Sequence, residues 1–96
     1  MITVKVNYQT QRMVVSGHSG YAETGKDIVC AAVSMATEVL KVAAVGNENA
    51  VVEDDGETME IQAAGFAFWA VLRDVTIALQ HLEEEYGDYV KVEVEG

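Results

Sequence analysis

The residues of this sequence best placed to do chemistry are Cys30, its only cysteine, and His18, one of its two histidines. Cys30 stands three residues after Asp27, where a predicted helix begins. A helix N-terminus carries roughly half a positive charge, which favours a thiolate, and its free amides can hold an oxyanion. A histidine close to the thiol can take its proton and later protonate a leaving amine. The pair therefore indicates nucleophilic acyl transfer, provided that the fold brings the two side chains together.

Each candidate also has a plainer interpretation, and the spacing leaves both open. Cys30 suits a small buried side chain, and His18 at a strand end suits a surface or capping residue. Asp27 is the expected N-cap of the helix, and its charge opposes a thiolate at Cys30. Ser34, one turn beyond Cys30, can line a site or bond a backbone carbonyl. Glu23 can orient His18 or simply face solvent.

The elements that must position these residues follow from the apolar pattern. Alternation predicts strands over residues 2–8 and 12–18. Residues 17–25 carry three of the eight glycines and predict a flexible loop. Helical spacing then predicts a helix from about residue 28 to 45, with Gly46 near its end. The histidine and the cysteine are thus expected on either side of a glycine-rich loop.

The second half of the chain predicts the remaining elements. Asp55-Gly56 is a strong hairpin signal between strands at 50–54 and 57–62. An apolar stripe predicts a second helix over residues 68–86, and alternation predicts a last strand over 90–94. The order ββαββαβ predicts a two-layer α+β fold, with a mostly antiparallel five-stranded sheet and two helices on one face.

Composition limits the class of protein and its partners. The 96 residues, half of them hydrophobic, suffice for one domain with its own core, so we expect a single domain over 1–96. A net charge of −10 argues against direct binding of nucleic acid. One cysteine and two histidines fall short of a structural zinc site, and no cofactor is indicated. No apolar stretch approaches the ~20 residues of a membrane span, and the alternating amino terminus does not resemble a signal peptide. We therefore expect a cytoplasmic protein.

The charge is concentrated after residue 48, where twelve acids stand against two bases. Two interpretations remain open for this half of the chain. It is an ordinary solvated surface, or it is an acidic face that attracts a basic partner.

Residues 17–34 read GHSGYAETGKDIVCAAVS. This string resembles the two-part signature of the ribosomal-processing cysteine protease family, Prp, which pairs a GHxGYAExG loop with a DIVCAAVS helix start. Both parts stand here at the separation found in the family. The rest of the chain is similar to the family in length and layout.

The resemblance implies a homodimeric, cytoplasmic endopeptidase. Its substrate would be a large-subunit ribosomal protein, the twenty-seventh in the bacterial naming, which loses a short N-terminal extension by cleavage after a Phe-Phe pair. The resemblance makes Cys30 the nucleophile and His18 the general acid and base, with Asp27 and Ser34 in support. It also implies a mobile gating loop that includes Gly17, Gly20, Tyr21, Glu23 and Gly25.

Two other functions remain as alternatives. A ribosome-associated module without catalytic activity would use the acidic face for binding, but would have little need of both Cys30 and His18. A redox-sensing thiol would need a partner for Cys30 from another molecule, because the chain holds no second cysteine.

Overall fold

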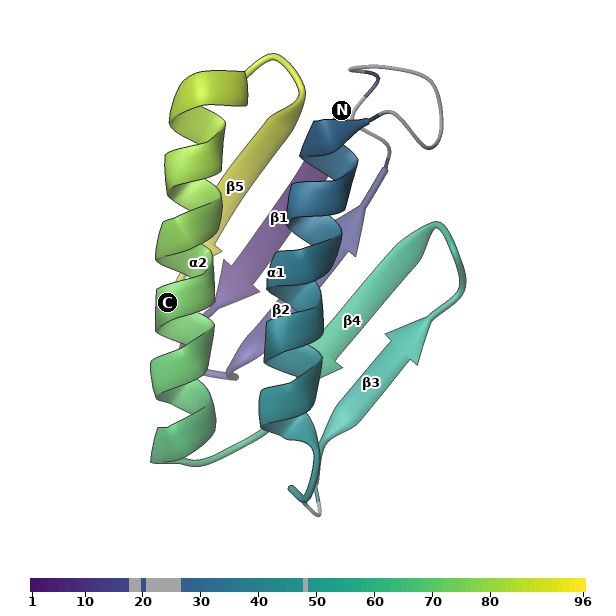
Figure 1. Cartoon of the computed structure of the whole chain (residues 1–96). Coiled ribbons are helices and arrows are strands. Elements are labelled where there is room, and N and C mark those ends of the chain that lie inside the picture. The colour runs from purple at the N-terminus through teal and green to yellow at the C-terminus, as the bar shows by residue number, and fades with distance from the viewer. Residues whose placement is uncertain (18–19, 21–26, 48) are drawn as a thin grey trace.

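The structure is a computed structural model, and it describes residues 1–17, 20, 27–47 and 49–96. Two helices pack side by side on one face of a single sheet (Figure 1). The predicted α+β fold and the order ββαββαβ are both confirmed. The elements are β1 (Ile2–Asn7), β2 (Arg12–Ser16), α1 (Ile28–Ala44), β3 (Val51–Asp54), β4 (Thr58–Gln62), α2 (Phe66–Tyr86) and β5 (Val90–Glu95).

The sheet has the strand order β3-β4-β2-β1-β5. Its hairpin neighbours β1–β2 and β3–β4 are antiparallel, and so are β2 and β4. The exception is β5, which runs parallel to β1 because α2 carries the chain back across the sheet. The expectation of a mostly antiparallel sheet is therefore confirmed.

The core lies between the sheet and the helices. Alternate strand residues point into it, so that Val4 stands beside Val15 of β2 and Val92 of β5. Leu40 of α1 and Leu72 of α2 pack into the core from the helix layer, and neither side chain has exposed surface. The helices thus bury the apolar side of β1 and β2, which is why the period-2 pattern of these two strands was informative.

One detail of α1 differs from what residue type alone predicts. The apolar Ala32 is exposed, whereas the polar Thr37 is buried. The Thr37 hydroxyl donates a hydrogen bond to the carbonyl of Ser34 at 3.0 Å, which satisfies its polar atom inside the helix. A threonine paired in this way packs like an apolar residue, and the pattern of residue types does not reveal it.

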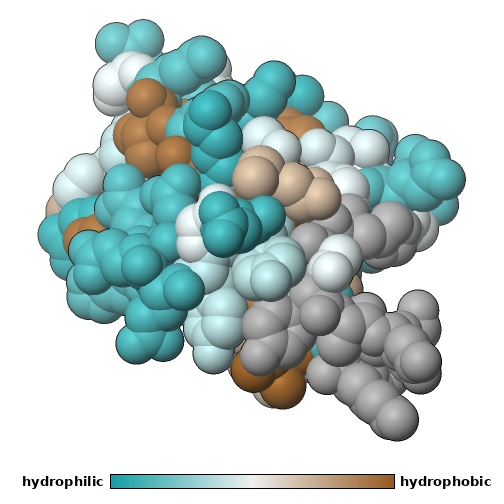
Figure 2. Space-filling model, turned by 90° about the horizontal axis from the view of Figure 1, so that it is seen from above, coloured by the Kyte–Doolittle hydropathy of each residue, from teal (hydrophilic) through white to brown (hydrophobic). Residues whose placement is uncertain are grey.

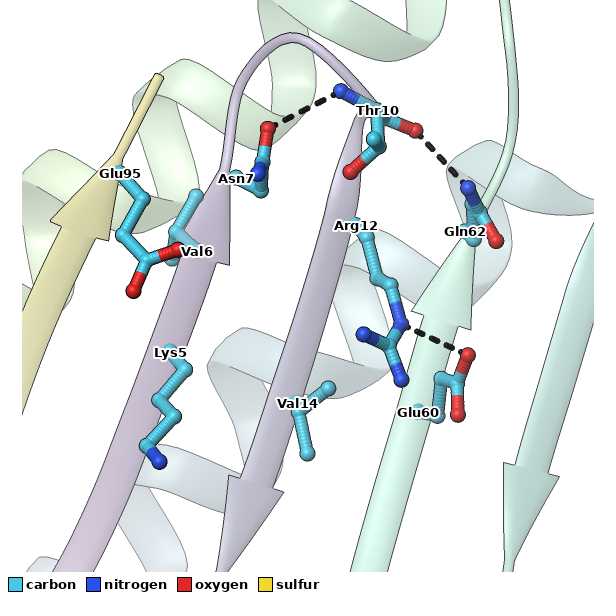
Figure 3. A pocket seen from close by; sticks show the side chains of 9 residues that line it. All are labelled: Lys5, Val6, Asn7, Thr10, Arg12, Val14, Glu60, Gln62 and Glu95. Atoms are coloured by element: carbon cyan, nitrogen blue, oxygen red, sulfur yellow. Dashed lines mark hydrogen bonds and ion pairs between the residues drawn. The ribbon is translucent and has the colours of Figure 1, made fainter.

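On the opposite face of the sheet, which is polar, none of the described residues forms a helix (Figure 3). Arg12 of β2 donates a hydrogen bond to Glu60 of β4 at 2.8 Å, and this bond lowers the pKa of Glu60 and raises that of Arg12. A shallow cavity of about 620 Å³ on this face is lined by such residues and lies away from Cys30. Within the described part of the chain, no helix combines the length and the apolarity needed to cross a membrane.

Candidate active site

The first turn of α1 fixes the position of Cys30. Asp27 is the N-cap, as predicted, with an extended backbone at φ −82° and ψ 98°. Its Oδ1 accepts a hydrogen bond from the Cys30 amide at 2.9 Å, and its carbonyl accepts one from Ala31 at 3.1 Å. The amide of Cys30 is therefore engaged by Asp27. Helix geometry leaves the amides of Ile28 and Val29 without intrahelical acceptors.

Cys30 is a partly buried free thiol that opens into a cleft of about 150 Å³. The cleft lies between α1 and the β3–β4 hairpin. On the helix side its wall continues from Cys30 to Ser34, which is exposed at the surface. The structure therefore brings together two of the predicted site residues. The other described residues that line the cleft are Ile2, Val15, Gly17, Val33, Thr37, Asp54, Gly56, Glu57, Thr58 and Met59.

Gly17, which precedes His18 in the sequence, lines the same cleft. Its φ is +87°, and its N–H donates a hydrogen bond to the carbonyl of Glu57 at 3.3 Å. A Cβ on this residue would overlap the carbonyl oxygen of Met1. The resemblance places Gly17 in the expected gating loop. The structure gives two reasons of its own for a glycine here, the positive φ and the close approach of the amino-terminal backbone.

The remaining predictions about the loop stay predictions. β2 ends at Ser16, two residues short of the predicted strand end. Of the expected gating loop, Gly17 and Gly20 are described, and Gly20 is exposed with φ +71°. His18, Tyr21, Glu23 and Gly25 lie outside the described residues.

The β3–β4 hairpin supplies the part of the site that the sequence did not reveal. Asp54, Glu57 and Met59 line the cleft opposite Cys30, although they stand more than twenty positions further along the chain. The signal available in the sequence was the Asp-Gly turn, which predicted the hairpin but not its contact with α1. That contact is tertiary, and no local spacing encodes it.

The hairpin gives this wall of the cleft an acidic rim. Asp54 forms an ion pair with Lys41 of α1 at 3.6 Å. Asp55 accepts hydrogen bonds from the amides of Thr58 at 2.7 Å and Glu57 at 2.9 Å, and these bonds hold its pKa below the ordinary 3.8. Seen from the end at which α1 begins, the visible surface is mostly hydrophilic, with small separate hydrophobic patches (Figure 2).

The residues that the structure describes contain no group of three or more His, Cys, Asp or Glu side chains able to hold a metal ion. The nucleophile that the structure places at the cleft is the Cys30 thiol. A free cysteine in the first turn of a capped helix, facing a cleft, is an arrangement that cysteine hydrolases use.

Comparison with known families identifies the hydrolase. The family model described as cysteine protease Prp matches residues 1–91. The chain belongs to this family, and the protein is therefore a cysteine protease.

Solved structures agree with this assignment. The chain is similar to the essential ribosomal processing protease Prp of S. aureus in complex with a covalently linked product peptide. That match has a TM-score of 0.84 and 25% identity, and covers 99% of this chain and 100% of the other. A second structure of the S. aureus protease, in complex with a substrate peptide, has a TM-score of 0.79 and 23% identity, with coverage of 99% and 100%.

A Streptococcus mutans protein shares the fold with a TM-score of 0.69 and 23% identity, over 97% of this chain and 90% of its own. Comparison with curated proteins finds no match.

Proposed function

We propose that this protein is an endopeptidase that removes a short N-terminal extension from a bacterial large-subunit ribosomal protein, the twenty-seventh, by cleavage after a Phe-Phe pair. One observation carries the proposal. Cys30 and Gly17, which belong to the two separate halves of the protease signature, line a single cleft. The product and substrate peptides in the S. aureus structures support a peptide as the ligand of such a cleft.

In the proposed mechanism His18 takes the proton of the Cys30 thiol, and the sulfur attacks the scissile carbonyl. The oxyanion of the tetrahedral intermediate is stabilised by backbone amides at the start of α1, where a helix N-terminus offers donors without intrahelical acceptors. His18 then donates its proton to the leaving amine, and the substrate remains bound to Cys30 as a thioester. Water attacks the thioester with His18 as base, which releases the carboxylate product and restores the thiol.

Asp27 and Ser34 have supporting roles in this proposal. Asp27 acts through its bond to the Cys30 amide and so positions the nucleophile. The exposed hydroxyl of Ser34 lies in the cleft, where it is available to a peptide carbonyl or amide. The segment from Gly17 to Gly25 would act as the gate over the cleft.

The cellular setting of the proposal follows from the substrate and from the family resemblance. Ribosomal proteins are made in the cytoplasm, so we place the enzyme there. The resemblance adds a homodimer as the working form. The acidic second half of the chain suits a basic substrate protein, because opposite charges raise the rate of encounter.

The test uses a quenched fluorescent peptide that carries the Phe-Phe cleavage site. Cys30→Ala and His18→Ala should each lower kcat/KM on the order of 10³-fold or more, because nucleophile and base act as a unit. His81→Ala is the matched control, since His81 is exposed on α2 and outside the cleft. It should cleave like the wild type.

Activity of His18→Ala within a few-fold of the wild type would remove this histidine from the mechanism. Absence of turnover by the wild type, together with binding of the ribosomal protein, would favour the non-catalytic binding module instead.

A further inference from the structure

The two edge strands of the sheet, β5 and β3, differ in whether their outward backbone groups have hydrogen-bond partners. At β5 the N–H of Val92 points away from β1, because Tyr89 and Glu95 provide the carbonyls that face β1. Glu83 of α2 accepts a hydrogen bond from this N–H at 3.0 Å. The outward N–H of Val92 is therefore already hydrogen-bonded to a side chain and is not available to a further strand. Natural sheets often protect their edges in such ways.

The edge formed by β3 has no such cover within the described part of the chain. All residues of β3 are exposed, and the strand has β4 as its only neighbour in the described sheet. The hydrogen bond from Asp55 N–H to the Thr58 carbonyl sets the phase of the hairpin. In an antiparallel pair the bonded positions alternate. Val52 and Asp54 therefore direct their N–H and C=O groups outward, where an added strand can reach them.

Charge selects which kind of strand can add to this edge. Four acidic residues lie at this edge: Glu53, Asp54, Asp55 and Glu57. Within the described part of the chain, Lys41 forms an ion pair with this group, at 3.6 Å from Asp54. Pairing of β3 with β3 of a second copy would bring two such sets of carboxylates together, which is unfavourable. An extended segment rich in lysine or arginine can form the same main-chain bonds with attraction instead of repulsion.

The edge is continuous with the cleft that holds Cys30. The side chain of Asp54 lines that cleft, while its backbone belongs to the open edge. In Figure 1 β3 lies on the outer side of the hairpin, beyond the part of the sheet covered by α1. A peptide that leaves the cleft along the hairpin therefore meets the free edge of β3.

We propose that β3 is a docking strand for a cationic segment of the substrate, next to the cleavage site, which binds as an additional strand of the sheet. This inference rests on the proposed function and adds a preference in sequence and conformation outside the Phe-Phe pair. Main-chain bonds give the segment its extended form, and the hairpin carboxylates select its charge. The gain appears in KM, because the segment lies away from the reacting atoms.

The test compares peptides that share one scissile core. One has uncharged flanks, and two carry a lysine-rich flank of four residues at one end or the other. A cationic flank at one of the two ends should raise kcat/KM by a few-fold to about tenfold, mainly through KM, as expected for one or two exposed ion pairs. The uncharged flank forms the same main-chain bonds, so the difference between the peptides reports the charge. N-methylation of alternate flank residues should abolish the gain in one phase and preserve it in the other, because only alternate amides face β3.

Two protein variants separate local docking from general attraction. Glu53→Gln and Glu84→Gln each remove one exposed negative charge, the first on β3 and the second on α2. Glu53→Gln should lower the advantage of the cationic flank by a few-fold and leave the uncharged peptide unaffected. Glu84→Gln should change neither substrate. Anisotropy of the labelled flanked peptide on Cys30→Ala should give the same ranking without turnover.

The outcomes distinguish this inference from the function on which it rests. If the wild type cleaves the core peptide but gains nothing from either flank, docking on β3 is wrong and the protease function stands. If neither set of alternate N-methylated amides reduces the gain, the flank is attracted by charge without adding as a strand. That result would also overturn the proposal. If no peptide is cleaved and none binds to Cys30→Ala, both the function and the docking fail.

Discussion

The carboxylate of Asp27 caps the helix turn that carries Cys30, and one substitution removes it. Asp27→Ala deletes the 2.9 Å hydrogen bond to the Cys30 amide. Loss of an N-cap of this type costs about 1 kcal/mol, within a range of about 0.5–2. Loss of negative charge from the helix N-terminus adds about 0.3–1 kcal/mol. We therefore expect Asp27→Ala to lower the free energy of unfolding by about 1–2 kcal/mol.

Asp27→Asn is the matched control for this substitution. Asparagine caps helices about as well as aspartate, so this variant should lose only the charge contribution of about 0.3–1 kcal/mol. Each kcal/mol shifts Tm by roughly 4–8 °C in a domain of this size. The alanine variant should therefore melt at the lowest temperature and the asparagine variant between it and the wild type.

Urea unfolding followed by circular dichroism measures the stabilities, and cleavage of the Phe-Phe peptide measures the effect on the site. If Asp27 acts by positioning Cys30, Asp27→Ala should lose activity at temperatures where it is still folded, and Asp27→Asn should stay within a few-fold of the wild type. Equal stability of Asp27→Ala and the wild type would refute the cap. A loss of activity as large in Asp27→Asn would show that the charge itself takes part in catalysis.

Three further predictions test other features of the structure. Gly17→Ala should lower the free energy of unfolding by at least about 1–2 kcal/mol in a urea titration, because alanine resists the left-handed angle and its Cβ would overlap the Met1 carbonyl; unchanged stability would refute the close approach. Asp55→Ala should be less stable than the wild type above about pH 5, because the folded state lowers the pKa of this carboxyl. That difference should shrink as the pH falls through 3.8 and below, and a difference independent of acid would contradict the bonds to Glu57 and Thr58. Finally, rising salt should slow cleavage of an intact basic protein substrate but not of an uncharged peptide, since screening acts over ~8 Å at physiological ionic strength; an equal response of both would reduce the acidic half to a solubility feature.

Much of the fold was accessible from the sequence because its elements are one-sided. Strands covered by helices on a single face must alternate apolar and polar residues, and the Asp55-Gly56 turn marks its own hairpin. The order of strands across the sheet was not accessible in the same way. The parallel pairing of β5 with β1 joins the two ends of the chain, and periodicity within a strand carries no information about its neighbour.

In the site, too, the local features were predictable from the sequence and the contacts between elements were not. Local spacing predicted the cap at Asp27, the position of Cys30 in the first helical turn and the common face of Cys30 and Ser34. The wall opposite, with Glu57 and Met59, depends on how α1 crosses the hairpin. Sequence patterns gave the hairpin and the helix separately, whereas only the packed structure shows that a cleft lies between them.

Gly17, which precedes His18 in the sequence, and Cys30 are held by different elements of one core. β2 leads to Gly17, whose amide is bonded to Glu57 of the hairpin, and α1 carries Cys30. Val15 of β2 and Val33 of α1 are buried in the same cluster and both line the cleft. The separation of Gly17 and Cys30 is therefore set by the packing of a helix on a sheet. A substitution that repacks this core should change the activity more than its effect on stability implies.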